Sequence, residues 1–172
     1  LGGGQHRVLC GDSTNPDDME KLMDGEEADL IVTDPPYNVN YEGGTEKKLT
    51  IKNDNMSDAE FYNFLLEAYM RMYENLKPGG AFYIFHADME GLNFRKALKD
   101  AGFKLASCLI WVKNSLVLGG KDYHWRHEPI LYGWKEGAAH YFIDDRTQST
   151  VFDDKIDLDK LKKEELKELL EK

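Results

Sequence analysis

Ala28-Asp29-Leu30-Ile31-Val32-Thr33 runs directly into Asp34-Pro35-Pro36-Tyr37, and the expected class of fold follows from these ten residues. The first six are largely apolar and partly β-branched, and two prolines close the run. They therefore predict a buried strand that ends at Asp34. In open α/β sheets, ligands bind just beyond the carboxyl ends of the strands. The tetrapeptide thus places a carboxylate and an aromatic ring where chemistry is expected.

The residue types of this tetrapeptide suit methylation of an amino group on a base. Asp34 can accept a hydrogen bond from an NH2 group. Pro35 and Pro36 lack N–H groups, so backbone carbonyl groups here are free to accept as well. Two acceptors on one NH2 group would orient the nitrogen lone pair toward an electrophilic methyl group, and Tyr37 can stack on a base taken out of its helix. The alternative is a strand followed by a Pro-Pro turn with a surface tyrosine.

Helical and extended patterns alternate along the rest of the chain. The expected strands are 7–10, 28–33, 81–85, 104–113 and 129–134, and the expected helices are 13–24, a long one that opens at the capping box 57–60, and 89–101. Pro78-Gly79-Gly80 is expected to end the long helix. The alternation indicates a mainly parallel α/β sheet, in which the last two strands can form a hairpin with one antiparallel strand.

Bulk composition indicates one globular domain. The chain has 172 residues, of which 41% are hydrophobic and 31% are charged. No apolar run approaches the ~20 residues of a membrane span and no signal peptide opens the chain, so a cytoplasmic protein is expected. Cys10 and Cys108 both lie in expected strands and are interpreted as small buried side chains in a reducing compartment. No Cys/His spacing predicts a metal site.

The charge is unevenly distributed. The net charge is −10, which argues against strong general affinity for nucleic acid. Residues 1–30 hold eight acidic and two basic residues, whereas residues 104–135 hold five basic and two acidic residues. Any DNA-facing surface is therefore expected within the second segment.

Several stretches together resemble a known family. They are His6-Arg7-Val8-Leu9-Cys10-Gly11-Asp12-Ser13, the Asp-Pro-Pro-Tyr box, Lys77-Pro78-Gly79-Gly80, Trp111-Val112-Lys113-Asn114 and His127-Glu128-Pro129-Ile130-Leu131-Tyr132. From about Gln5 to Val151 the chain resembles DNA adenine-N6 methyltransferases that use S-adenosylmethionine. It is similar to the group whose catalytic motif precedes the Gly-rich cofactor motif, as in phage-type modification methylases of restriction-modification systems. The resemblance implies a Rossmann-like methyltransferase fold and double-stranded DNA with a flipped adenine as substrate.

The resemblance also implies a cofactor site. Asp34, Pro35, Pro36 and Tyr37 would form the catalytic box, and Asp12 would accept from the amino group of the cofactor adenine. A helix N-cap is the alternative for Asp12. Asn38 and His86 are further cofactor candidates, with turn chemistry and a purely structural histidine as their alternatives.

DNA contacts are expected in two loops. The basic and aromatic candidates are Lys47, Lys48, Lys113, Lys121, His124, Trp125 and Arg126. Lysine and arginine suit phosphate, and aromatic rings can stack on unpaired bases. An ordinary hairpin loop and a solvated loop are the alternative interpretations.

The chain departs from the family pattern in one respect. It has no Phe-x-Gly-x-Gly loop for the methionine end of the cofactor, and Leu1-Gly2-Gly3-Gly4 precedes the first expected strand. The fold is therefore expected to be incomplete on its C-terminal side, with an exposed sheet edge that a complementary chain or dimer partner would cover. Residues 1–152 would be the catalytic and target-recognition part, and 153–172 a charged amphipathic helix that acts as linker or docking segment.

Three functions remain open at this point. The first is an adenine-N6 DNA methyltransferase. The second is a catalytically incomplete fragment or a DNA-binding assembly module. The third keeps the chemistry but changes the substrate to cytosine-N4, RNA or a protein amide.

Overall fold

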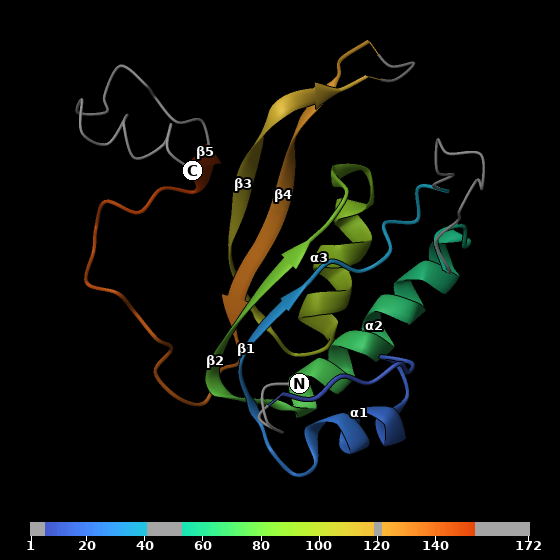
Figure 1. Ribbon diagram of the computed structural model, residues 1–172, viewed down its shortest axis with the longest axis vertical. Helices are drawn as coiled ribbons and strands as arrows, with labels where there is room; N and C mark the ends of the chain where they lie inside the picture. The colour runs from blue at the N-terminus through green and yellow to red at the C-terminus, as the bar shows by residue number, and fades with distance from the viewer. Residues whose placement is uncertain (1–5, 41–52, 119–121, 154–172) are drawn as a thin grey trace, which may run out of the picture.

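A computed structural model describes residues 6–40, 53–118 and 122–153. Within them one five-stranded sheet has the order β1-β2-β4-β3-β5 (Figure 1). The strands are β1 Ala28–Thr33, β2 Leu76–Phe85, β3 Lys104–Val117, β4 Trp125–Trp134 and β5 Val151–Asp153. The helices are α1 Pro16–Met23, α2 Asp58–Glu74, the 3₁₀ turn η2 Asp88–Glu90 and α3 Gly91–Asp100.

The sheet is mixed, with one strand reversed. β1 pairs in parallel with β2, and β3 pairs in parallel with β5. β4 lies between β2 and β3 and is antiparallel to both. Four strands therefore run one way and β4 runs the other, which confirms the expected hairpin and its single antiparallel strand.

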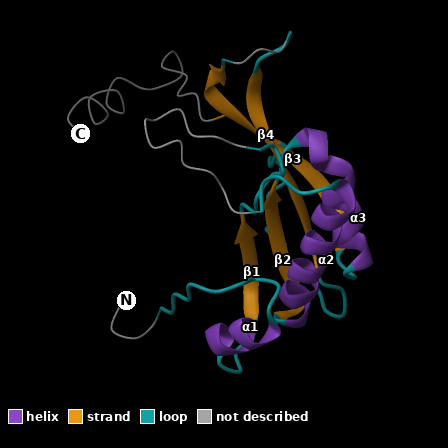
Figure 2. Ribbon diagram, turned by 90° about the vertical axis from the view of Figure 1, so that its right-hand side faces the viewer, coloured by secondary structure: helices purple, strands orange, loops and turns teal. Residues whose placement is uncertain are grey.

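Helices α2 and α3 cover one face of the sheet, as Figure 2 shows. The core between the two layers contains Phe61, Leu65 and Tyr69 of α2, Phe82 and Ile84 of β2, Phe94, Ala97 and Leu98 of α3, and Leu131 of β4. α2 begins with the expected capping box, in which Ser57 and Glu60 each accept from the backbone N–H of the other. This core holds α2 and α3 against strands β2 and β4.

The expected end of α2 at Pro78-Gly79-Gly80 is wrong, because α2 ends at Glu74 and these residues belong to β2. Gly79 has a φ of +80°, and a Cβ at this position would lie 2.5 Å from the carbonyl oxygen of Ala139. Glycine thus permits both the backbone turn and the close approach of the segment after β4.

The expected strand at residues 7–10 is also wrong. This segment has no regular structure, Val8 is 79% exposed, and Cys10 is exposed rather than buried. The Arg7 guanidinium instead donates to the Met23 carbonyl at 2.8 Å and pairs with Asp24 at 3.1 Å. The segment is thereby tied to the end of α1, and no described strand lies beside it to supply a ladder.

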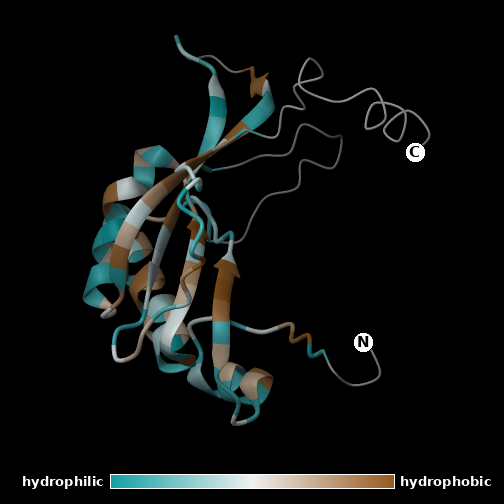
Figure 3. Cartoon of the chain, turned by 90° about the vertical axis from the view of Figure 1, so that its left-hand side faces the viewer, coloured by the Kyte–Doolittle hydropathy of each residue, from teal (hydrophilic) through white to brown (hydrophobic). Residues whose placement is uncertain are grey.

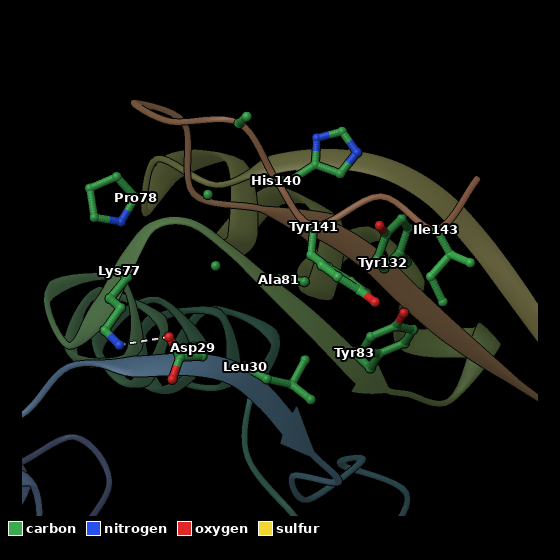
Figure 4. A pocket seen from close by; sticks show the side chains of 13 residues that line it. Asp29, Leu30, Lys77, Pro78, Ala81, Tyr83, Tyr132, His140, Tyr141 and Ile143 are labelled. Atoms are coloured by element: carbon green, nitrogen blue, oxygen red, sulfur yellow. Dashed lines mark hydrogen bonds and ion pairs between the residues drawn. The ribbon is translucent and has the colours of Figure 1, made fainter. Parts of the chain in front are cut away.

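The second face of the sheet carries no helix of the described residues, and β1 forms its open edge (Figures 2 and 3). β1 pairs only with β2 among these residues, and Leu30 and Val32 are 51% and 63% exposed. A cavity of about 670 Å³ lies on this face, between Leu30, Tyr83 and Tyr132 and the strap 139–143 (Figure 4). Lys77 and Asp29 close one end of it with an ion pair of 2.6 Å.

Within the described ranges, no helix combines the length and apolar character of a membrane span.

Candidate active site

The Asp-Pro-Pro-Tyr box lies at the carboxyl end of β1, beside the carboxyl end of β2. Thr33 is in register with Ile84, so Asp34 follows the point where the two parallel strands end together. Asp34 is exposed, whereas Pro35, Pro36 and Tyr37 are half-buried. The strand register thus places the carboxylate at the surface and the ring against the protein.

Tyr37 is held in place from two sides. Its ring meets Phe94 of α3 edge-on, with centroids 6.4 Å apart, and its hydroxyl interacts with the nearby Asp34 carboxylate. Burial, the interaction with Asp34 and the nearby negative charges of Asp34 and Glu128 raise the pKa of Tyr37 well above its usual range. The phenol is therefore neutral.

Asp54 fixes the backbone of this loop and was not expected from the sequence. Its side chain is 3% exposed, and one carboxylate oxygen accepts from the backbone N–H of Tyr37 at 3.1 Å and of Val39 at 3.3 Å. Its own carbonyl accepts from Asn40 N–H at 2.7 Å. A buried carboxylate with several N–H donors is a strong local clamp. Asp54 therefore sets the position of Tyr37 through the backbone.

Asn38 acts on the same loop. It has a φ of 58°, a left-handed conformation that asparagine tolerates better than most residues. Its side-chain amide donates to the Met56 carbonyl at 3.2 Å and accepts from Met56 N–H at 2.7 Å. Both polar ends of the amide thus join the box to the start of α2. The expected cofactor contact of Asn38 stays a prediction, and the geometry favours its alternative of turn chemistry.

A cavity of about 310 Å³ opens beside Tyr37. Its walls come from the box loop, from the η2 turn and from the β3–β4 hairpin. The lining residues are Tyr37, Val39, Ala87, Asp88, Met89, Lys113, Val117, Trp125, His127, Glu128 and Pro129. The site combines apolar and aromatic walls with a few charged groups, which is typical of a binding site for a planar, polar ligand.

The hairpin side of this cavity carries an ion pair. Lys113 of β3 pairs with Glu128 of β4, and only 26% and 21% of these side chains is exposed. Trp125 meets His127 edge-on, with ring centroids 5.4 Å apart. Arg126 does not line the cavity, and its guanidinium donates to the Lys113 carbonyl at 3.3 Å. The hairpin therefore brings Lys113 and Trp125, both expected DNA contacts, to the cavity beside Tyr37.

His86 follows β2 but does not line this cavity. It is 0% exposed, its ring lies 5.3 Å from Phe94, and Nδ1 is 3.1 Å from the Pro129 carbonyl oxygen. Burial and the positive charge of Arg95 lower the pKa of His86 to about 4. The ring is thus neutral and joins β2 to β4, as its structural alternative predicts. Its cofactor role stays a prediction.

Asp12 combines a local turn with an exposed carboxylate. Its Oδ1 accepts from Thr14 N–H at 3.0 Å and from the Thr14 hydroxyl at 2.8 Å, and its backbone N–H donates to Asp18 at 2.8 Å. Asn15, not Asp12, caps α1. A cavity of about 120 Å³ lies here, lined by Leu9, Gly11, Asp12, Ser13, Asp18, Met19 and Leu22. This cavity shares no lining residue with the one beside Tyr37.

The remaining expected DNA contacts differ in their exposure, and some lie outside the described residues. His124 and Arg126 are exposed on the hairpin, and Trp125 is half-buried in the cavity wall. Lys47, Lys48 and Lys121 lie outside the described residues, as do residues 154–172 of the expected helix 153–172. The expected start of that helix is wrong, because Asp153 is the last residue of β5 and pairs with Val112 of β3. Over 6–40, 53–118 and 122–153, no group of three or more His, Cys, Asp or Glu side chains is arranged to hold a metal ion.

Comparisons with known proteins agree on one family. A family model described as DNA methylase, of the N6/N4 methyltransferase type, matches residues 28–170. The type II methyltransferase M.HpaI of Haemophilus parainfluenzae is 30% identical over 141 residues, which are 81% of this chain and 42% of that protein. The DNA adenine methyltransferase YhdJ of Escherichia coli K12 is 29% identical over 128 residues, 73% of this chain and 40% of that protein. The chain thus spans about two fifths of the length of these curated relatives.

Solved structures support the fold. M1.HpyAVI in complex with SAM has a TM-score of 0.58 and 20% identity, over 84% of this chain and 61% of that one. TTHA0409 of Thermus thermophilus, described as a DNA modification methylase, has a TM-score of 0.58 and 19% identity, over 87% of this chain and 66% of that one. The expected methyltransferase-like α/β fold is therefore confirmed.

Proposed function

Since the chain belongs to the DNA methylase family of the N6/N4 type, we propose that it carries the catalytic and target-recognition part of an adenine-N6 DNA methyltransferase. In this proposal residues 1–152 form that part and residues 153–172 form a linker or docking segment. The substrate is duplex DNA with the target base extruded, and the reaction takes place in the cytoplasm.

One observation carries the proposal: Tyr37 of the Asp-Pro-Pro-Tyr box lines a cavity at the strand end that Asp34 follows. The carboxylate of Asp34 lies at a strand end and interacts with the hydroxyl of Tyr37, and the ring of Tyr37 lines a cavity of about 310 Å³. A carboxylate acceptor next to an aromatic wall is the chemistry that a base with an exocyclic amino group requires. Its position past the end of a parallel strand is the usual one for a ligand in this class of fold.

The residues have separate roles in the proposed reaction. Asp34 and the Pro35 carbonyl each accept one hydrogen of the amino group, and this orients the nitrogen lone pair. Tyr37 stacks on the base and partly offsets the few kcal/mol that extrusion costs. Rate enhancement then comes mainly from positioning, since the amino nitrogen is held in one orientation for attack. Asp54 contributes by fixing the backbone of Tyr37.

S-Adenosylmethionine would supply the electrophilic methyl group. The residues described fit it in part, because the exposed Asp12 carboxylate can accept from an adenine amino group while it also bonds to Thr14. The side chain of Asn38 is hydrogen-bonded to the backbone of Met56, and Nδ1 of His86 lies within hydrogen-bond distance of the Pro129 carbonyl oxygen. These two residues would therefore affect cofactor binding indirectly, through the loop and the strand that they hold in place. We propose that a further polypeptide segment with the Gly-rich loop completes the site and covers β1 and the bare sheet face.

Two alternatives keep specific support. The same acceptors suit cytosine-N4, which is also an amino group beside a ring nitrogen. A non-catalytic assembly module is favoured by the open β1 edge with Leu30 and Val32 exposed.

The test is transfer of labelled methyl groups to DNA, followed by identification of the methylated base in digested product by mass spectrometry. The assay uses the chain alone and the chain supplemented with a polypeptide that carries the Gly-rich segment. Asp34→Ala should abolish transfer and leave circular dichroism unchanged. Glu67→Ala, which removes an exposed carboxylate on α2, is the matched control and should retain activity. Methyl transfer by a well-folded Asp34→Ala variant would remove Asp34 from the mechanism.

A further inference from the structure

The β3–β4 hairpin extends past the rest of the sheet, as Figure 1 shows. β2 follows β4 only to the pair Phe85 and Ile130, and β5 follows β3 only to the pair Val112 and Asp153. Beyond these pairs, among the described residues, β3 and β4 pair only with each other. The register also shifts between Val112 and Val117, which marks an irregular, twisted ribbon.

The end of this hairpin is apolar and exposed. Leu116 and Val117 are 47% and 53% exposed, and Leu118 and Tyr123 are 79% and 90% exposed. Single exposed apolar residues are common on protein surfaces, but a cluster at the end of a projecting element indicates a contact surface. We call these four residues the hairpin tip.

The hairpin tip continues from the wall of the cavity beside Tyr37. Val117 belongs to both, and Trp125 and His127, on the facing strand, line the same cavity. A ligand bound in the cavity would therefore lie against the ribbon that carries the tip. Arg126 is exposed on the same ribbon and carries one positive charge, and the exposed Asp122 lies next to Tyr123.

We propose that the hairpin tip inserts into the base stack of duplex DNA next to the target base. Leu118 and Tyr123 would fill the space that the extruded base leaves. The proposal rests on the proposed function, which puts that base in the cavity beside Tyr37. A two-stranded β-ribbon fits the major groove, and apolar side chains that enter between base steps are a known way to hold DNA in a distorted form. The exposed Arg126 on the same ribbon can bind a phosphate beside the inserted side chains.

The experiment measures binding of the 172-residue chain to two duplexes of one sequence by fluorescence anisotropy. One duplex is intact and the other has a single abasic site. An inserting tip prefers the abasic duplex, because no base has to leave the stack, and we expect a preference of about tenfold or more, since unstacking costs a few kcal/mol. Leu118→Ala with Tyr123→Ala should abolish that preference. Leu92→Ala, 80% exposed on α3, is the matched control and should keep the wild-type ratio.

Each other outcome overturns the proposal. Equal affinity of the wild-type chain for both duplexes, absence of DNA binding, or an unchanged ratio in the double variant would each exclude insertion. Concentration-dependent dimerisation that the double variant abolishes, without any abasic preference, would assign the tip to a second copy of the chain. Failure of the proposed function is distinguished by the methyl-transfer assay: transfer by the wild type together with no abasic preference overturns only the insertion.

Discussion

Replacement of Asp54 by alanine should release the loop that carries Tyr37. The carboxylate is 3% exposed and accepts from the N–H groups of Tyr37 and Val39. A hydrogen bond to a charged group contributes about 1.5–3 kcal/mol, so loss of two predicts a decrease of about 3–6 kcal/mol in the free energy of unfolding. That decrease is comparable to a large part of the stability of a typical domain. Asp54→Asn keeps an acceptor of the same shape and should lose less.

Two measurements separate a local from a general effect. Urea unfolding followed by circular dichroism gives the change in stability for Asp54→Ala and Asp54→Asn. Hydrogen exchange measures protection of the Tyr37 and Val39 amides, which should fall on the order of 100-fold in Asp54→Ala, since about 1.4 kcal/mol corresponds to a factor of ten. Asp29→Ala, which removes an exposed ion pair, should change stability by less than about 1 kcal/mol. The reasoning is refuted if the two amides exchange at the wild-type rate in a folded Asp54→Ala variant.

Three further predictions concern the site. In an active methylating preparation, DNA with 2-aminopurine at the target position should become more fluorescent when that base leaves the stack. Tyr37→Ala should lose this increase, because stacking on the ring contributes ~1–3 kcal/mol per base, whereas Tyr37→Phe should keep it. An unchanged signal in Tyr37→Ala would make Tyr37 a packing residue only. Calorimetry should give the chain alone a millimolar or weaker dissociation constant for S-adenosylmethionine, because the hydrogen bonds expected from a Gly-rich loop, ~1.5–3 kcal/mol each, would not form. A micromolar dissociation constant would contradict this prediction. The pKa of His86 is lowered from 6.5 to about 4, so at a pH between these values the unfolded chain binds a proton that the folded chain does not. The free energy of unfolding should therefore fall by about 2 kcal/mol when the pH is lowered from about 7 to about 5. His86→Gln should remove most of that pH dependence in urea unfolding, and an equal dependence in both proteins would contradict the assignment.

Local signals were sufficient for much of this fold. The capping box at Ser57 and the paired apolar runs of β3 and β4 each predict their element correctly, because each pattern depends on neighbouring residues alone. The β-branched run before Asp34 predicts the strand correctly, but its expected burial is wrong, because no residue of β1 is buried and Leu30 and Val32 lie on a face that no described helix covers. The reversed direction of β4 also follows from a local hairpin. The position of the box at a strand end needed no more than this.

The errors come from contacts between distant segments. Residues 7–10 have a strand-like composition, but a strand forms only where another strand pairs with it, and Arg7 binds the end of α1 instead. Pro78-Gly79-Gly80 resembles a helix stop, yet Gly79 lets the segment at Ala139 pass closely. Composition does not reveal either partner.

The site residue missed by the sequence is Asp54. It lies in a polar loop with no motif, and its partners Tyr37 and Val39 are 17 and 15 residues away. A signal was present in the asparagines around it, because Asn38, Asn40 and Asn53 all adopt positive φ. Asparagine tolerates this conformation best among residues with a side chain, so these asparagines indicate tight turns at positions 38–40 and 53, the two described ends of the loop.

The place of β4 between β2 and β3 has a consequence for the order of folding. The cavity beside Tyr37 takes its first wall from residue 37 and its last from residues 125–129, so nearly ninety residues separate the two halves. Contacts of such sequence separation form late, because a long loop must first be closed. During synthesis the box and helices α2 and α3 precede residues 125–129, which supply the last wall of the cavity. A nascent chain that ends before Trp125 therefore has the catalytic box and lacks the cavity beside it.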